Sequence, residues 1–372
     1  MSSDLFAGAR RAEQFIEPDE ELRPSELGAV ERAALEGTSP AAPAEAADRQ
    51  ISPAPEVDEA VPAPVVGMVG AARSELIRPG ATERVRAQWG WRKLLGLRPG
   101  PVEQAHLDAE RVIRQATWRR AVNVLVANKT GGVGKTTASL VLAGVLGRVR
   151  GGSVAAFEVA DATGALEKRG EGTPVRGLGE LVQTAGRVAS SGELAGYAAP
   201  QTSLAHVIGS VADRPVLTGE DVRAVRTVLD RYYRVTVADS GNNPHSEAFT
   251  AAVGTADVLV IPTLLSSVSV LDALDVLENV SRMGEHGRKL AETAVVVINH
   301  DGRPEDKDTA QRARRQLVRV QEQSPGVSLV EVPFDGHVSK GGEITLASLS
   351  ANSGRAWTQV AATVTRKLLD NV

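Results

Sequence analysis

The chain has 372 residues, of which 42% are hydrophobic and only 3% aromatic, so its core is built mostly from aliphatic side chains. The absence of cysteine excludes disulfides, thiolate metal sites, iron–sulfur clusters and a cysteine nucleophile, and the net charge of −4 excludes a uniformly polybasic chain. No apolar run approaches the ~20 residues of a membrane span, and the first residues do not resemble a signal peptide. We therefore expect a soluble, cytoplasmic protein.

Residues 1–80 are acidic and rich in proline. They carry seven arginines, no lysine and 15 acidic residues, a net charge of −8, so the remaining residues carry +4. They also hold nine of the 19 prolines. Their Ala- and Pro-rich runs lack periodic apolar residues, so burial cannot repay the entropy of ordering. We predict a disordered acidic tail that is either a tether for partners or a passive linker.

Residues 81–120 form a basic segment with three of the four tryptophans. Basic, aromatic and leucine residues are interleaved in its first half: Arg84, Arg86, Trp89, Trp91, Arg92, Lys93, Leu94, Leu95, Leu97 and Arg98. Gly90 and Gly96 interrupt helix formation there, and a helical pattern begins at Val102. Two interpretations stay open: a linker helix that docks on the following domain, or a contact for an anionic membrane, nucleic acid or partner.

From residue 121 onward, short apolar runs alternate with helical patterns. The runs are nearly continuously apolar, as in parallel strands that are covered on both faces; they lie at 122–127, 154–158, 204–208, 235–238, 258–262, 294–299 and 328–332. The clearest helical patterns lie at 137–146, 222–231, 269–283 and 308–322. This order predicts a doubly wound α/β domain over 121–372, with a mostly parallel sheet between two helical layers. Because such sheets bind ligands at the carboxyl ends of their strands, we expect functional residues directly after these runs.

A glycine-rich loop follows the first predicted strand and leads into a helix. Its core is Gly131, Gly132, Val133, Gly134, Lys135, Thr136 and Thr137. Glycines let backbone N–H groups face a phosphate chain, and the helix N-terminus adds its positive dipole. In this arrangement Lys135 reaches the β- and γ-phosphates and the Thr136 hydroxyl binds Mg²⁺. The pattern predicts a P-loop, in which Lys129 stands at the usual position of the first glycine.

Gly131–Thr137 resembles the deviant Walker A motif of the ParA/MinD family, the SIMIBI class of P-loop ATPases. Later segments are similar to its ParA-like partition subgroup, namely residues 178–181, 196–197, 200–203 and 256–262. In that family a signature lysine stands immediately before the two glycines and reaches the partner's nucleotide across a dimer. This chain has Thr130 at that position and Lys129 one residue earlier. The resemblance implies either that Lys129 takes over the role or that activation across the dimer is altered.

The resemblance also assigns carboxylates after two later strands. Glu158 resembles the first switch I carboxylate, while Asp161 stands one residue after the second and orients the attacking water or, alternatively, caps the next helix. Asp239 ends a strand that looks like Walker B, and it is expected to hold Mg²⁺ together with Thr136 and Glu158. The catalytic residues implied are Lys129, Lys135, Asp161 and Asp239.

Two further strand ends resemble the family's base-binding parts. Asn299 is similar to the asparagine that hydrogen-bonds adenine, although an asparagine at a strand end is also a common turn former. Pro333, Phe334 and Asp335 look like the loop that closes over the base. The resemblance covers residues 121–372 and implies ATP and Mg²⁺ as cofactors.

For the whole protein, the resemblance implies an ATPase that is slow, partner-stimulated and dimeric with ATP, and that positions or segregates DNA or protein cargo. Its implied partners are a second copy, non-specific DNA and a ParB-like activator, at the bacterial nucleoid. Four arginines on a predicted helix are candidates for phosphate contacts or form an ordinary solvated face: Arg312, Arg314, Arg315 and Arg319.

Two alternatives stay open. One is a MinD-like membrane- or secretion-associated regulator that works through the basic tryptophan segment, and the other is a nucleotide switch with little hydrolysis. The last predicted helix carries an apolar stripe, which favours packing on the sheet over insertion into lipid. The stripe consists of Trp357, Val360, Ala361, Val364 and Leu368.

Overall fold

The computed structural model describes residues 86–304 and 306–372. The described residues belong to one compact unit, Arg78–Val372. The predicted disorder of residues 1–80 lies outside the described residues, as do the first five residues of the basic segment.

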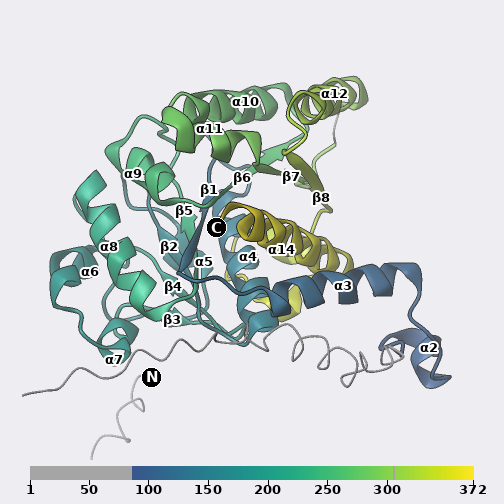
Figure 1. The fold of residues 1–372 in the computed structure, drawn as a ribbon, viewed down its shortest axis with the longest axis horizontal. Coiled ribbons are helices and arrows are strands. Elements are labelled where there is room, and N and C mark those ends of the chain that lie inside the picture. Colours follow the sequence, from purple (N-terminus) through teal and green to yellow (C-terminus); the bar gives the residue numbers. More distant parts are fainter. Residues whose placement is uncertain (1–85, 305) are drawn as a thin grey trace, which may run out of the picture. The chain divides into compact units, whose positions relative to one another are not determined.

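Eight strands form one sheet in the order β3-β4-β2-β5-β1-β6-β7-β8 (Figure 1). Every neighbouring pair is parallel except β3 and β4, which pair antiparallel. The strands are β1 (Val122–Val126), β2 (Val154–Glu158), β3 (Ala199–Pro200), β4 (Ala205–Ile208), β5 (Val235–Asp239), β6 (Val258–Leu264), β7 (Val295–Asn299) and β8 (Ser328–Val332). The seven predicted strands and the doubly wound α/β fold are confirmed, and β3 is additional.

The central strands are buried on both faces because helices cover both sides of the sheet. Along β1, Val122, Val124 and Val126 belong to the core beneath α4 and α14, whereas Leu125 belongs to the core on the opposite face. This alternation follows from the two-residue period of a strand, and it explains why β1 reads as a continuous apolar run.

The helices fall into two layers on the sheet (Figure 1). One layer holds α3 (Pro101–Gln115), α4 (Lys135–Arg150) and α14 (Ala351–Asn371). The other holds α6 (Leu178–Thr184), α8 (Gly219–Tyr232), α9 (Glu247–Thr255), α10 (Ser267–Ser281), α11 (Gly284–Glu292) and α12 (Lys307–Gln323). Short helices complete the fold: α2 (Gly90–Leu94), α5 (Leu166–Arg169), α7 (Ser191–Ala195) and α13 (Gly336–Ser339).

Helix α14 packs on the sheet through the predicted apolar stripe. Trp357 is 2% exposed and the other four stripe residues are fully buried. Helix α3 lies beside α14, where Gln359 donates a hydrogen bond to the carbonyl of Ala105 at 3.0 Å. The helical part of the basic segment therefore docks on the sheet domain, as one of the two interpretations expected. Among the described residues no helix is both long enough and apolar enough to span a bilayer.

Candidate functional site

The glycine-rich loop, residues 128–134, joins the carboxyl end of β1 to α4. Gly132 and Gly134 have φ angles of 77° and 93°, a region that side chains with a Cβ rarely adopt. A Cβ on Gly134 would also lie 3.0 Å from Nδ2 of Asn299. Both the backbone conformation and this close approach therefore require glycine at position 134.

Lys135 is the first residue of α4, and its side chain turns back over the loop. It is 8% exposed, and its Nζ donates hydrogen bonds to the carbonyl of Thr130 at 2.8 Å and to Oδ1 of Asn242. Burial lowers the pKa of the ammonium group, and the charge of Asp239 opposes this shift. The amine is thus held by neutral oxygens, and an anionic phosphate would be a stronger partner. Lys135 lines a cavity that we call the phosphate cavity, which is formed by Gly131, Gly132, Gly134, Lys135, Thr136, Thr137, Glu158, Ala160, Gly164, Ala165, Arg169, Asp239, Ser240, Gly241 and Asn242.

Asp239 lies at the end of β5, directly beside the start of α4. Its carboxylate accepts hydrogen bonds from the hydroxyls of Thr136 and Ser139, each at 2.8 Å, and burial raises its pKa to about 6. A buried carboxylate and a hydroxyl are oxygen ligands of the kind that Mg²⁺ takes up together with phosphate and water. Within the described ranges no three His, Asp or Glu side chains gather as a metal site. The Asp239 carboxylate and the Thr136 hydroxyl, which are in direct contact, fit a Mg²⁺ ion that is bound jointly with a nucleotide.

Glu158 ends β2 and pairs in register with Asp239 of β5. Its Oε1 accepts hydrogen bonds from the amide of Gly164 at 3.1 Å, from the hydroxyl of Ser210 at 2.7 Å and from Nη2 of Arg214 at 2.6 Å. Its Oε2 has no hydrogen-bond partner in the described part of the chain. Glu158 lines the phosphate cavity, but one of its two oxygens is already neutralised by an arginine.

Asp161 lies in the β2–α5 loop, residues 159–165, which the resemblance assigned to switch I. Its Oδ2 accepts a hydrogen bond from Nδ2 of Asn243 at 3.1 Å, so it links this loop to the loop after β5. It does not line the phosphate cavity formed by the described residues. The alternative that Asp161 caps the next helix is wrong, because α5 begins at Leu166 with Ala165 as its N-cap.

Arg214 holds the β2–α5 loop, and no sequence motif predicted this role. Its side chain is 3% exposed and donates hydrogen bonds to the carbonyls of Ala160 at 2.8 Å, Asp161 at 3.0 Å and Ala162 at 3.2 Å, besides its ion pair with Glu158. Arg214 lies in the loop between β4 and α8, more than 50 positions after Glu158 in the sequence. No local motif therefore marks the contact between the two side chains.

Lys129 and Thr130 face α10 rather than the phosphate cavity. The Nζ of Lys129 lies 2.8 Å from Oδ2 of Asp275 and 3.6 Å from Oδ1 of Asp272, and these contacts raise its pKa. The Thr130 hydroxyl donates a hydrogen bond to Asp272. In this structure Lys129 therefore lies apart from Lys135 and is ion-paired within its own chain.

A second cavity adjoins the phosphate cavity and is formed by the ends of β7 and β8, the glycine-rich loop and the start of α14. Its lining includes Gly131, Gly132, Val133, Gly134, Thr137, Arg169, Asn299, Pro333, Phe334, Asp335, Ser353 and Trp357. Nδ2 of Asn299 donates a hydrogen bond to the carbonyl of Val133 at 2.8 Å, and the Asp335 carboxylate accepts from the amides of His337 and Ser350. The cavity brings together all the residues that the resemblance assigned to the base.

Arg169 of α5 lines both cavities, and no sequence motif pointed to it. Its Nη2 donates a hydrogen bond to the carbonyl of Val338 at 3.1 Å, while its buried Nε has no partner among the residues described. The side chain therefore stands at the boundary between the phosphate and base parts of the site.

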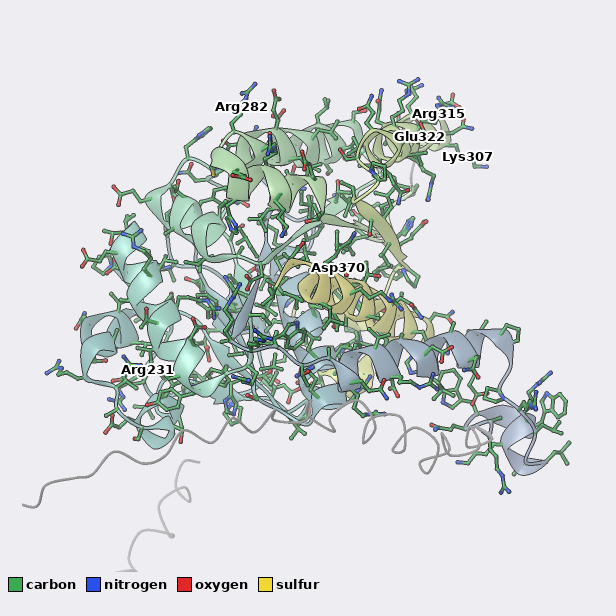
Figure 2. All side chains as sticks on the ribbon, viewed as in Figure 1. Arg231, Arg282, Lys307, Arg315, Glu322 and Asp370 are labelled. Atoms are coloured by element: carbon green, nitrogen blue, oxygen red, sulfur yellow. The ribbon has the colours of Figure 1, made fainter. Side chains whose placement is uncertain are left out.

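The four arginines of α12 are exposed. Arg314 pairs with Glu331 through two hydrogen bonds of 2.7 and 2.8 Å and thereby lowers the pKa of Glu331 to about 2. Arg312 donates a hydrogen bond to the Thr309 hydroxyl at 3.0 Å. Figure 2 shows Arg315 on the outer side of α12, away from the sheet.

Comparisons with known proteins agree with this geometry. A family model described as the CobQ/CobB/MinD/ParA nucleotide binding domain matches residues 124–343. The ESX-1 secretion-associated protein EspI of Mycobacterium tuberculosis is 28% identical over 284 residues, which cover 71% of this chain and 40% of EspI, so the chain spans less than half the length of this relative.

Several solved structures are similar in fold. McdA from Cyanothece in complex with ATP is 18% identical, with a TM-score of 0.46 over 68% of this chain and 98% of McdA. The cell division ATPase MinD from Pyrococcus furiosus is 17% identical, with a TM-score of 0.48 over 66% of this chain and 99% of MinD. A ParA family ATPase from Chlorobium tepidum is 16% identical, with a TM-score of 0.48 over 67% of this chain and 97% of that ATPase.

Proposed function

Because the chain belongs to the CobQ/CobB/MinD/ParA family of nucleotide-binding domains, we propose that it binds Mg²⁺ and ATP at the P-loop and hydrolyses ATP. We further propose that its ATP-bound form is a homodimer that positions DNA or protein cargo and is released by a partner-stimulated hydrolysis step. The contact that carries the proposal is the Thr136–Asp239 hydrogen bond at the mouth of the phosphate cavity, with the buried amine of Lys135 beside it.

The chemistry rests on charge stabilisation and positioning, as phosphoryl transfer requires. Bound Mg²⁺ supplies positive charge at the phosphate oxygens, and Thr136 and Asp239 would hold it. Lys135 would exchange its contacts with Thr130 and Asn242 for the phosphates, which frees the loop after β5 to respond to the nucleotide. Asp161 is proposed to orient the attacking water, from a loop that it already joins to Asn243.

Dimerisation with ATP is proposed to use Lys129. Its present partners, Asp272 and Asp275, lie on α10 of the same chain. Release from this surface ion pair costs little, because water and salt screen the charges of such pairs. The lysine is therefore available to take the place of the signature lysine that Thr130 replaces.

We propose helix α12 as the contact for non-specific DNA, and with it a cytoplasmic protein that associates with the nucleoid. The helix carries five basic and two acidic residues, and the guanidinium of Arg315 lies on its outer side (Figure 2). Arginines on an exposed helix bind phosphates without reading sequence, with an affinity that falls steeply with salt.

The test is DNA retention by the full chain with ATP and with ADP, at two salt concentrations. We expect retention with ATP only, weaker at higher salt, and lost in the double variant Arg315→Gln/Arg319→Gln. The matched control is Arg282→Gln, which removes an exposed arginine just after the C-terminal end of α10. Retention that ignores the nucleotide, or that survives the double variant and falls in the control, would contradict the DNA contact.

A nucleotide switch with little hydrolysis would share the same site. Turnover with and without DNA separates the two, because a switch keeps its ATP affinity but shows no increase in phosphate release. A second candidate function, regulation of protein secretion, is favoured by the match to EspI over 71% of this chain. Under that function, removal of the chain from its host changes the set of secreted proteins and leaves DNA segregation intact.

A further inference from the structure

Residues 86–98, which we call the hook, carry a dense group of exposed apolar side chains. Five large ones are exposed by 38–87% within nine residues: Trp89, Trp91, Leu94, Leu95 and Leu97. Elsewhere in the ranges described, exposed large apolar side chains occur singly or in pairs along the sequence. A concentrated apolar patch on a protein surface marks an interaction site more often than scattered apolar residues do.

Backbone hydrogen bonds close the hook into a defined loop, so the exposure of its apolar side chains is not a result of fraying. The amide of Ala87 donates a hydrogen bond to the carbonyl of Leu97 at 2.8 Å, and the amide of Leu97 donates to the carbonyl of Arg92 at 3.0 Å. The buried Glu103 of α3 accepts hydrogen bonds from the amides of Gln88 and Trp89. These bonds satisfy the backbone on the inner side of the hook.

The two tryptophans have different surroundings. The ring of Trp89 contacts the imidazole of His106, with centroids 5.0 Å apart, and the guanidinium of Arg355 lies 5.6 Å from its centroid. Trp91 is 61% exposed, and Leu94 and Leu95 are exposed by 87% and 66%. Trp89 therefore anchors the hook to α3 and α14, while Trp91, Leu94 and Leu95 form its outer tip.

The hook is also positively charged. It holds Arg86, Arg92, Lys93 and Arg98, and residues 86–102 contain no Asp or Glu. Basic side chains beside exposed Trp and Leu suit a surface that is anionic at its rim and apolar beneath. A DNA backbone offers the charge but no apolar phase for leucines, and an acidic protein would need a matching pocket for three large side chains.

We propose that the hook binds the surface of an anionic lipid bilayer. The tip residues Trp91, Leu94 and Leu95 enter the headgroup and upper acyl region, and the basic residues contact the lipid phosphates. The contact is independent of the nucleotide site, so it goes beyond the proposed ATPase function and survives if that function fails.

The test is co-sedimentation of the full chain with vesicles of phosphatidylcholine, with and without phosphatidylglycerol. We expect binding to the anionic vesicles only, and a loss of about tenfold or more in Leu94→Glu/Leu95→Glu, since two charges would have to enter the apolar layer. Arg92→Gln/Lys93→Gln should weaken anionic binding and flatten its salt dependence. The matched control is Val175→Glu, because Val175 is 95% exposed outside the hook.

A second measurement reports on depth. Brominated lipids should quench the fluorescence of the wild-type protein, and Trp91→Phe should lose most of this quenching. Trp357 is buried, the ring of Trp118 lies beside the Arg150 guanidinium outside the hook, and Trp89 packs on His106. The proposal is overturned if the wild type ignores anionic vesicles, if Leu94→Glu/Leu95→Glu binds them as the control does, or if the same variant loses DNA or a protein partner instead. Lys135→Ala should still bind the vesicles, which separates this outcome from a failure of the ATPase function.

Discussion

At the residue scale, the two lysines of the glycine-rich loop have different surroundings. Lys135 is 8% exposed and bound to loop oxygens, whereas Lys129 is ion-paired with Asp275 on the surface. A buried amine that faces a phosphate cavity contributes directly to ligand affinity, but the amine of Lys129, which is paired with carboxylates of α10, does not. The two side chains can therefore be separated by experiment.

We expect Lys135→Ala to lower ATP affinity on the order of 100-fold, which corresponds to the loss of charge-assisted hydrogen bonds to phosphate. Lys129→Ala is the matched variant, and it should keep ATP affinity within about threefold while losing ATP-dependent dimerisation. Calorimetry measures the first quantity and sedimentation velocity the second. If Lys135→Ala binds ATP normally, the site is misassigned, and if Lys129→Ala still dimerises, Lys129 does not replace the signature lysine.

Glu167 of α5 gives the stability of the folded protein a pH dependence. It is 5% exposed, and burial raises the pKa of its carboxyl to about 7; the charge of Glu158 adds to the rise and the backbone of Gly209 opposes it. Because the pKa of Glu167 in the folded protein lies above its ordinary value of 4.5, the folded protein binds more protons than the unfolded chain between pH 4.5 and about 7. Stability should therefore fall as the pH rises from 4.5 through 7, by up to ~3 kcal/mol for this group.

Glu167→Gln removes that ionisation. The variant should match the wild type near pH 5 and exceed it in free energy of unfolding at pH 8, as measured by denaturant titration without Mg²⁺. Glu285→Gln, at an exposed position of α11, should show no such difference. Equal stability of Glu167→Gln and wild type at pH 8 would mean that the buried carboxyl is stabilised by contacts other than its proton.

Some residues of the site can be identified from a short stretch of sequence, and others only from contacts in the folded chain. The glycine-rich loop and Asp239 were predictable because each directly follows or ends an apolar run that reads as a strand. Ligands of open α/β sheets bind at the carboxyl ends of the strands. Arg214 and Arg169 were not, because each acts across a long sequence separation through contacts that only the folded chain creates. Asp161 lies on the predicted loop, but its orientation toward Asn243 depends on how two loops meet.

At the scale of elements, the β2–α5 loop is fixed by one buried ion pair. The guanidinium of Arg214 and the carboxylate of Glu158 are 3% and 1% exposed, and Arg214 also binds three carbonyls of the loop. A variant that removes only one of the two charges leaves the other buried without a partner, which is costly. A variant that replaces both side chains by neutral ones avoids much of that cost.

A double-mutant cycle tests this role. Arg214→Met should destabilise the protein by about 3–5 kcal/mol, because Glu158 is left as an uncompensated buried charge. The double variant Arg214→Met/Glu158→Gln should lose less than the sum of the single variants, although the three carbonyl contacts are not recovered. Additive losses in denaturant unfolding would show that the pair does not couple.

The strands were predictable because burial on both faces leaves almost uninterrupted apolar runs, as in Val295–Asn299. Strand β3 was missed because it has two residues, one of them Pro200, and it pairs antiparallel at the edge of the sheet. The predicted strand at 204–208 begins one residue later, at Ala205, because Leu204 has a φ of 65° in the turn after β3. Helices α9 and α11 were not among the clearest helical patterns, and each has only nine residues.

At the scale of the whole molecule, charge is divided along the chain. Residues 1–80 carry a net charge of −8 and the remainder +4. Both proposed anionic partners, DNA at α12 and lipid at the hook, would be bound by the basic part. An acidic segment on the same chain is a tethered competitor for such surfaces, whatever its conformation, because its charges stay at high local concentration.

Neutralising five acidic residues of the tail should therefore strengthen binding to both polyanions. The variant replaces Glu45, Asp48, Glu56, Asp58 and Glu59 by their amides, and we expect a gain of roughly threefold to tenfold at low salt. The gain should vanish near 1 M salt, where the Debye length is about 3 Å. A tail with the same composition in shuffled order is the control and should behave like the wild type, because charge rather than sequence does the competing. An unchanged affinity at low salt, for DNA and vesicles alike, would show that the tail does not screen the basic surfaces.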